Sequence, residues 1–381
     1  MKKINLILVL ITAILISCNT EKTSYKINGT IKGIDKNTPI ILMNFKQDTL
    51  ATTKLTEGKF SFSGTVNEPT EVYVTYGNPY SSLILENDDY SAAINIEDDK
   101  TFQFKGGKLN TLINAYKEFP EFIKSDKALR DHVKLYDQIN EEDKEAMTLF
   151  MNSYDEKNKV VSDIKLDYLK GIVEGKYSGI EKFYGLKKAG QNSGYSYKKR
   201  IELTKEFQQG YETYKPMDNY IASLENAIKI ETMSKTVAIG ADFKEVIAST
   251  KDGETVKLSD VIANNEYTLL EMWASWCGPC RGEFPNLKKA YSHYKNKGFE
   301  IYGLSIDEKK DKWLKAEAEE EIPWISVVDF TGFKSKAILN YGVRGIPSSF
   351  LISKEGKIVA SMNEVRGTNL DDKLKELFSK E

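Results

Sequence analysis

The chain has 381 residues, enough for two or three domains, and its charge is almost balanced: 54 Lys and Arg stand against 56 Asp and Glu, for a formal net charge of −2. Because the sequence contains no basic field or basic run, we set nucleic-acid binding aside as a class of function. A charged fraction of 29% and a hydrophobic fraction of 40% are typical of a globular body.

The N-terminus is predicted to be a targeting segment, residues 1–17. Two lysines precede an apolar run from Leu6 to Ile16, which is short for a membrane span and typical of a signal-peptide core. The run ends in Leu15-Ile16-Ser17-Cys18, which resembles the bacterial lipoprotein processing box. That resemblance implies lipid on the Cys18 sulfur and a periplasm-facing protein anchored in the cell envelope. A short uncleaved anchor and a plain secretory signal stay open, as does the choice between inner and outer membrane.

Residues 18–108 are predicted to form an all-β sandwich. Short alternating runs, such as Tyr25–Ile31 and Glu71–Tyr76, are separated by turn residues at the regular spacing of an antiparallel sandwich. No catalytic cluster is found in this segment.

Residues 109–235 are predicted to form a helical middle region. No proline falls between Pro120 and Pro216, and apolar residues recur at helical spacing, with a break near 190–195. We interpret the many charges as solvated helix faces, the aromatic residues as core, and His132 as a surface residue.

Residues 236–381 alternate between predicted strands and helices, which indicates an α/β domain with a parallel or mixed sheet. A buried strand at 267–273 leads into a helix at 278–295. Further strands are predicted at 299–306, 325–329, 348–353 and 357–362, and further helices at 311–321, 335–341 and 370–378.

Two of the three cysteines, Cys277 and Cys280, stand at the predicted strand-to-helix junction. A thiolate there faces free backbone N–H groups and a helix dipole, which lower a cysteine pKa. Cys277, at the helix N-cap, is expected to be exposed and to attack. Cys280, one turn on and farther inside, is expected to resolve the mixed disulfide. If Cys18 is lipidated, these two are the only thiols left.

A metal site is the alternative for this pair. It would need a second pair of ligands, and the chain offers only two histidines, His132 and His293. We therefore predict no metal and no other cofactor.

Several motifs in order carry a family resemblance. Trp273–Cys280 resembles the thioredoxin active-site segment, Gly345–Phe350 its cis-proline loop, and Lys354–Val359 the hairpin that follows. Cys280–Pro285 narrows the resemblance to the TlpA/ResA-like branch of membrane-attached thiol–disulfide oxidoreductases. Residues 236–381 are thus expected to adopt a thioredoxin-like fold, and 18–108 resemble the small β-domain that precedes such domains in envelope lipoproteins of Bacteroidetes-type bacteria.

The resemblance also suggests two carboxylates for proton transfer. Glu271 stands six residues before Cys277, where thioredoxins have a buried aspartate, and it is predicted to take the Cys280 proton. Glu283 matches a glutamate of the TlpA/ResA branch and is predicted to tune the thiol pKa values. A solvent-facing Glu283 beside Arg281 or Lys288 stays open.

The substrate face is predicted to surround the cysteines. The resemblance implies a cis peptide bond at Pro347, which would present the backbone of Ile346 to an extended substrate. The other predicted substrate contacts are Trp276, Gly278 and Pro279. Gly278-Pro279 is also the dipeptide of reducing thioredoxins, which favours reduction of protein disulfides.

We therefore expect an envelope reductase of disulfide-bonded proteins, re-reduced by an inner-membrane thiol electron donor, with apocytochrome c maturation as one possible target. A thiol peroxidase is the first alternative, because Ile239–Phe243 is shared with peroxiredoxins. Ala274 replaces their threonine and disfavours it. The second alternative is an envelope binding module in which the first 235 residues carry the main function.

Overall fold

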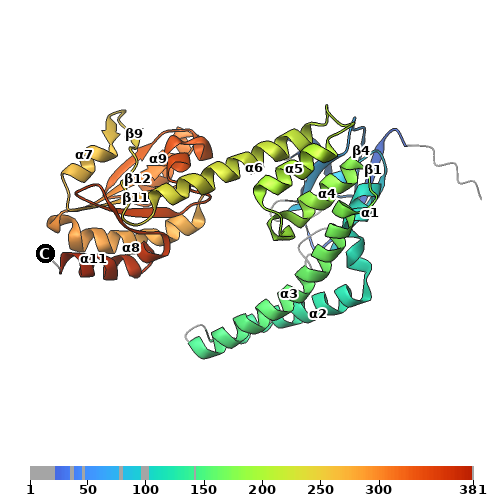
Figure 1. Cartoon of the computed structure of the whole chain (residues 1–381), viewed down its shortest axis with the longest axis horizontal. Coiled ribbons are helices and arrows are strands. Elements are labelled where there is room, and N and C mark those ends of the chain that lie inside the picture. The colour runs from blue at the N-terminus through green and yellow to red at the C-terminus, as the bar shows by residue number, and fades with distance from the viewer. Residues whose placement is uncertain are drawn as a thin grey trace, which may run out of the picture. The chain divides into compact units, whose positions relative to one another are not determined.

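The computed structural model describes residues 22–34, 38–44, 48–76, 80–95, 103–140 and 143–379 (Figure 1). The predicted signal segment and the predicted lipid site at Cys18 lie outside the described residues. The chain divides into two compact units, Met1–Ile221 and Ala222–Glu381. The finer domain boundaries near residues 108 and 235 stay predictions. None of the described helices is both long enough and apolar enough to cross a bilayer.

The first unit begins with two four-stranded sheets, in the orders β4-β1-β7-β8 and β3-β2-β5-β6. The strands are β1 (Tyr25–Lys32), β2 (Pro39–Asn44), β3 (Thr49–Lys54), β4 (Lys59–Gly64), β5 (Thr70–Thr75), β6 (Tyr80–Leu85), β7 (Asp89–Asn95) and β8 (Gln103–Gly106). Both sheets contribute apolar side chains to one shared core, which confirms the predicted β-sandwich.

Strand alternation decides which side chains enter that core. In β1, Ile27 and Ile31 are buried, whereas their neighbours Asn28 and Thr30 are exposed. Successive side chains of a strand point to opposite faces of the sheet. The outer face of the sheet β4-β1-β7-β8 is therefore polar.

The sandwich is not purely antiparallel, which corrects the sequence-based expectation. β1 pairs antiparallel with β4 but parallel with β7. The chain enters β7 from β6, a strand of the other sheet, so a crossover rather than a hairpin sets the direction of β7. Alternation reveals which face is buried, but it carries no information about the direction of the neighbouring strand.

A helical region follows the sandwich, as predicted. Its helices are α1 (Lys108–Asn114), α2 (Pro120–Val133), α3 (Lys144–Glu174), α4 (Gly179–Ala189), α5 (Tyr197–Phe207) and α6 (Lys215–Ser234). A short 3-10 turn, η3 (Gly190–Ser193), forms the predicted break between α4 and α5. The hydroxyls of Tyr184 and Tyr214 both donate to the carbonyl of Pro69, at 3.3 and 2.6 Å, and so tie the helices to the sandwich.

His132 differs from the surface residue that was expected. Its ring is half-buried and stacks on Phe150 with 4.4 Å between ring centroids, and its Nε2 lies 3.0 Å from the Phe150 carbonyl oxygen. The partner belongs to the next long helix, α3, a contact that the local sequence around His132 does not reveal.

The second unit is a mixed α/β domain around one seven-stranded sheet, in the order β10-β9-β13-β12-β11-β14-β15. Its strands are β9 (Ile247–Ser249), β10 (Thr255–Lys257), β11 (Tyr267–Trp273), β12 (Phe299–Ser305), β13 (Ile325–Val328), β14 (Ser348–Ser353) and β15 (Ile358–Ser361). Its helices are α7 (Leu258–Ala263), α8 (Gly278–Tyr294), α9 (Lys310–Glu319), α10 (Lys336–Asn340) and α11 (Asn369–Phe378).

The centre of this sheet positions the cysteine pair. β11 pairs parallel with β12, and β12 pairs parallel with β13, so all three strands end at the same edge. β14 runs antiparallel to β11 on its other side. The loops that follow β11, β12 and β13, and the loop that precedes β14, therefore meet around the start of α8.

Candidate active site

The cysteine pair lies at the N-terminus of α8, where the two sulfurs form a disulfide. Cys277 is the N-cap residue, and its Sγ accepts the backbone N–H of Cys280 at 3.2 Å. Pro279 fits the first turn because that turn needs no N–H from it. The N-terminal end of α8 therefore offers a hydrogen-bond donor and a favourable dipole to a Cys277 thiolate.

Cys277 is less exposed than predicted. It is 4% exposed, against 0% for Cys280, and the bond to Cys280 covers one side of its sulfur. Cys277 is thus the more exposed of the two cysteines, as expected for an attacking thiol, and Cys280 is the less exposed, as expected for a resolving thiol. Gly278 and Pro279 between them are exposed.

Asp307 holds the loop that carries Cys277, a residue that the sequence analysis did not select. Its carboxylate accepts hydrogen bonds from the Ser275 backbone N–H at 2.8 Å and the Ser275 hydroxyl at 2.6 Å. The Ser305 hydroxyl donates a third, at 2.8 Å. Asp307 is only 2% exposed, so these contacts are shielded from water. An acid directly after a buried strand beside β11 was the available signal.

Glu271 is a buried carboxylate inside β11, 2% exposed. Its Oε2 accepts the hydroxyl of Ser349 at 2.5 Å, and Oε1 has no hydrogen-bond partner among the described residues. Burial raises the pKa of Glu271 to about 8. The Ser349 hydrogen bond and the charge of Arg366 oppose this rise in pKa, and the charge of Glu283 adds to it.

Glu283 is half-buried and accepts the backbone N–H of Gly367 at 2.9 Å. The guanidinium of Arg281 forms ion pairs with Glu319 and Glu320, at 3.0 and 2.6 Å, and not with Glu283. Arg281, one of the two neighbours in the solvent-facing alternative for Glu283, is therefore engaged on another side, and the role of Glu283 stays a prediction. Glu283 connects α8 to the loop before α11.

The peptide bond between Ile346 and Pro347 is cis, as the resemblance implied. Both residues are half-buried, directly before β14, whose Ser348 pairs with Met272 of β11. The guanidinium of Arg366 donates a hydrogen bond to the Pro347 carbonyl. Arg366, also missed from the sequence, thereby links the cis-proline loop to the segment that Glu283 binds.

Trp276 and Phe333 form an exposed aromatic pair next to the disulfide. They are 60% and 46% exposed, with ring centroids 6.2 Å apart. Phe333 belongs to the short turn η6 (Gly332–Lys334) after β13 and was not predicted. Trp273, by contrast, is buried and packs on Phe284. Trp276 therefore presents an exposed aromatic surface beside the disulfide, whereas Trp273 belongs to the core.

A mixed α/β sheet, a C-x-x-C disulfide at a helix N-terminus and a cis-proline loop beside it define a thioredoxin-like thiol–disulfide oxidoreductase. Family comparison agrees with this class, because residues 239–361 match the AhpC/TSA family. Residues 25–113 match a domain of unknown function, DUF4369.

Comparison with individual relatives identifies the family to which the chain belongs. The chain is 30% identical over 142 residues to the thiol-disulfide oxidoreductase ResA of Bacillus cereus, across 37% of this chain and 78% of that protein. It is 29% identical over 149 residues to ResA of Bacillus thuringiensis subsp. konkukian, across 39% of this chain and 82% of the relative. Through this part of its sequence, the chain belongs to the ResA family of thiol–disulfide oxidoreductases.

Two solved structures of similar sequence come from Bacteroides species. The thioredoxin domain of a thiol-disulfide oxidoreductase from Bacteroides vulgatus is 33% identical, covering 37% of this chain and 97% of that one, with a TM-score of 0.35. A thiol-disulfide oxidoreductase from Bacteroides fragilis is 34% identical, covering 36% and 98%, with a TM-score of 0.34.

Proposed function

We propose that this protein reduces disulfides in other proteins of the cell envelope, using Cys277 and Cys280 as its dithiol. The observation that carries the reducing direction is Gly278-Pro279 between the two cysteines, at the N-terminus of α8. This is the dipeptide of reducing thioredoxins. Thioredoxin has a potential on the order of −270 mV, far below the −120 mV of a strong oxidant such as DsbA.

The reaction proceeds in two exchange steps. The Cys277 thiolate attacks one sulfur of a substrate disulfide, forms a mixed disulfide and releases the other substrate sulfur as a thiolate, which takes up a proton. Cys280 then loses its proton and attacks the Cys277 sulfur, which releases the second substrate thiol and forms the Cys277–Cys280 disulfide. Two electrons pass to the substrate, and a thiol donor restores the dithiol.

The surrounding residues take distinct roles in this proposal. Glu271 accepts the proton of Cys280, for which a buried carboxylate with a pKa near 8 is well matched. Glu283 tunes the pair through its charge. Trp276, Gly278 and Pro279 contact the substrate, and the backbone of Ile346, beside Pro347, pairs with it as an added strand.

The proposal also includes the location of the protein in the cell. The sequence Leu15-Ile16-Ser17-Cys18 supports a lipid on Cys18, and hence a membrane-anchored enzyme that faces the periplasm. There an inner-membrane thiol carrier would supply electrons, and apocytochrome c is one candidate substrate.

Two measurements test this proposal: trapping of mixed disulfides in cells, and the reduction potential of the purified protein. A Cys280→Ser variant cannot resolve the mixed disulfide, so we expect it to remain linked to substrates through Cys277 in cells, as mass spectrometry would detect. The purified wild-type dithiol should equilibrate near −270 mV against glutathione. A Cys277→Ser, Cys280→Ser double variant is the matched control. A potential near −120 mV, or no linked proteins from an exported and folded trap variant, would overturn the reductase assignment.

Thiol peroxidase is a second candidate, favoured by the match to the AhpC/TSA family over residues 239–361. Against it, Ala274 occupies the position of the peroxiredoxin threonine, three residues before Cys277. Rapid reduction of hydrogen peroxide with a sulfenic acid on Cys277 would support this candidate, and slow reduction would exclude it.

A further inference from the structure

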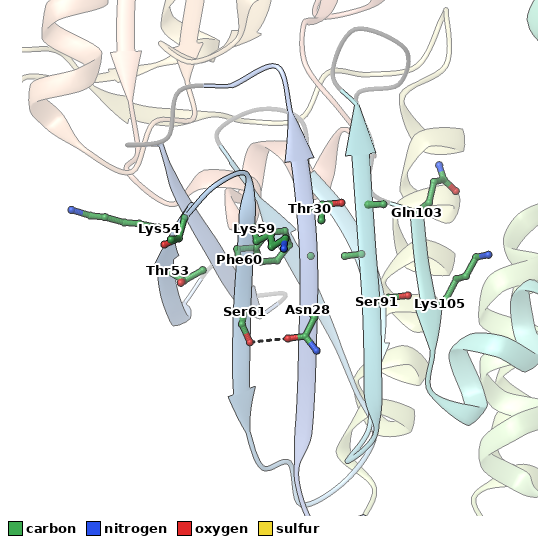
Figure 2. Close-up of a pocket in the computed structure, with 14 residues that line it drawn as sticks. Asn28, Thr30, Thr53, Lys54, Lys59, Phe60, Ser61, Ser91, Gln103 and Lys105 are labelled. Atoms are coloured by element: carbon green, nitrogen blue, oxygen red, sulfur yellow. Dashed lines mark hydrogen bonds between the residues drawn. The ribbon is translucent and has the colours of Figure 1, made fainter.

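An open trough of about 890 Å³ lies in the first unit, on the outer face of the sheet β4-β1-β7-β8 (Figure 2). Its floor includes the apolar residues Phe60, Ala92 and Ala93, together with the polar side chains that strand alternation turns away from the sandwich core. Those shown in Figure 2 include Asn28, Thr30, Ser61 and Ser91. The Ser61 hydroxyl donates to the Asn28 side-chain oxygen at 3.2 Å, within the floor. The floor thus offers hydroxyl and amide groups to a polar ligand.

Lysines stand on both sides of this floor. Lys54, at the end of β3, and Lys59, on β4, lie on one side, and Lys105, on β8, lies on the other (Figure 2). All three are exposed, and none of the fourteen residues that line the trough is acidic. The lining of the trough therefore carries three positive charges and no negative one, and the nearest acid along the chain is Glu57, in the turn between Thr56 and Lys59.

The positive charge extends beyond the trough. Lys26 and Lys32, at the two ends of β1, are exposed on the same outer face. Among the described strand residues of this face, the only acid is Asp89, and it already pairs with Lys22 at 3.0 Å. This face is complementary to an anionic partner.

The length of chain before β1 favours a membrane as that partner. Tyr25, the first residue of β1, lies seven positions after Cys18. An extended chain spans at most about 3.6 Å per residue, so a lipid on Cys18 would hold the start of β1 within about 25 Å of the bilayer. A lipid chain combined with a basic patch is a common pair of signals for stable attachment.

We propose that this lysine trough binds the headgroups of anionic phospholipids and so seats the sandwich on the membrane surface. The lysine ammonium groups would contact the phosphates, and the hydroxyl and amide floor would bind the glycerol and phosphate oxygens. The placement of this membrane beside the trough rests on the proposed lipid on Cys18, but the binding itself does not require that lipid.

The test therefore uses residues 19–381 without lipid, a chain that retains every described residue. Vesicles of phosphatidylglycerol mixed with phosphatidylcholine should bind it, whereas vesicles of phosphatidylcholine alone should not. Raising the salt concentration should weaken binding, because it screens exposed charges. Attachment of lipid to Cys18 would be measured separately, by incorporation of labelled fatty acid in cells.

The variant Lys59→Gln, Lys105→Gln should lower vesicle partitioning about fivefold for each lysine. The matched control is Lys198→Gln, Lys205→Gln, which removes the same charge from exposed positions of α5 and should bind as wild type. Circular dichroism would verify that both variants are folded. An equal loss in the two variants, binding to neutral vesicles, or binding to the free polyanion polygalacturonate but not to vesicles would each overturn the proposal. Insulin reduction by the same samples reports the dithiol activity independently.

Discussion

Glu271 shows how one buried side chain can serve this chemistry. Its Oε2 is held by Ser349, while Oε1 has no partner among the described residues, so this oxygen is free to take a proton. A pKa of about 8 lies close to that of an ordinary thiol, about 8.5, so the proposed proton transfer from Cys280 to Glu271 would cost little free energy.

The variant Glu271→Gln should slow resolution of the mixed disulfide by about 100-fold at neutral pH, because a general base typically contributes that much or more. Single-turnover kinetics of Cys280 attack measures this directly. Ser349→Ala keeps the carboxylate and is the matched control, so it should retain most of the rate. An unchanged rate in Glu271→Gln would show that Cys280 gives its proton to another group.

Stability should also depend on pH through Glu271. The pKa of Glu271 is about 8 in the folded protein, against an ordinary value of 4.5 for an exposed glutamate. The folded protein therefore retains the Glu271 proton to a higher pH than the unfolded chain does. Its contribution to stability is therefore fully present below about pH 4.5 and is lost as the pH rises towards 8. The Tm of Glu271→Gln should vary less between pH 5 and pH 8 than that of the wild type. Equal pH slopes would contradict the burial argument.

Some residues of the site could be predicted from the sequence, and others could not. Cys277, Cys280 and Glu271 could be selected because their positions follow from one local motif and its spacing. Arg366 could not, and Asp307 showed only its position shortly after a buried strand, because their hydrogen bonds reach Pro347 and Ser275, which are remote in the sequence. Contacts of this kind depend on which strands lie side by side, and no local pattern encodes that.

At the scale of elements, three parallel strand ends assemble the site. The loop after β11 carries Ser275 and Cys277, the loop after β12 carries Asp307, and the turn after β13 carries Phe333. The long strands were predictable from their apolar runs. β9 and β10, with three residues each, were missed because they are too short to show alternation. The parallel pairing of β1 with β7 was missed because a crossover sets it.

Asp307→Ala should loosen the loop that carries Cys277. It leaves the Ser275 N–H and hydroxyl without their buried acceptor, which should destabilise the second unit by about 3 kcal/mol. It should also change the rate at which reduced Cys277 reacts with iodoacetamide, since the N-cap geometry is no longer fixed. Urea unfolding and the alkylation rate measure the two effects.

Asp329→Ala is the control for Asp307→Ala. Asp329 follows the neighbouring strand β13, and among the described residues its side chain accepts the Thr331 N–H at 3.1 Å and does not bond to the cysteine loop. Its variant should leave the alkylation rate unchanged. Equal effects of the two substitutions would mean that Asp307 acts only on general stability.

At the scale of the whole molecule, the redox site is complete within one unit. The core around β11 is built entirely from residues between Val237 and Leu374, with further apolar side chains up to Phe378 packed against it. Cys277, Glu271, Asp307 and Pro347 all belong to that unit. The core of this unit and these four site residues are therefore supplied by the unit itself.

Residues 222–381 produced alone should consequently fold and reduce insulin at the rate of residues 19–381, within about twofold. The lysine trough lies outside this fragment, so the fragment should not bind anionic vesicles. Thermal unfolding, insulin turbidity and vesicle sedimentation on the two proteins compare these properties side by side. A tenfold slower reaction by a folded fragment would show that the first unit takes part in substrate recognition. Vesicle binding by the fragment would place the membrane contact elsewhere than in the trough.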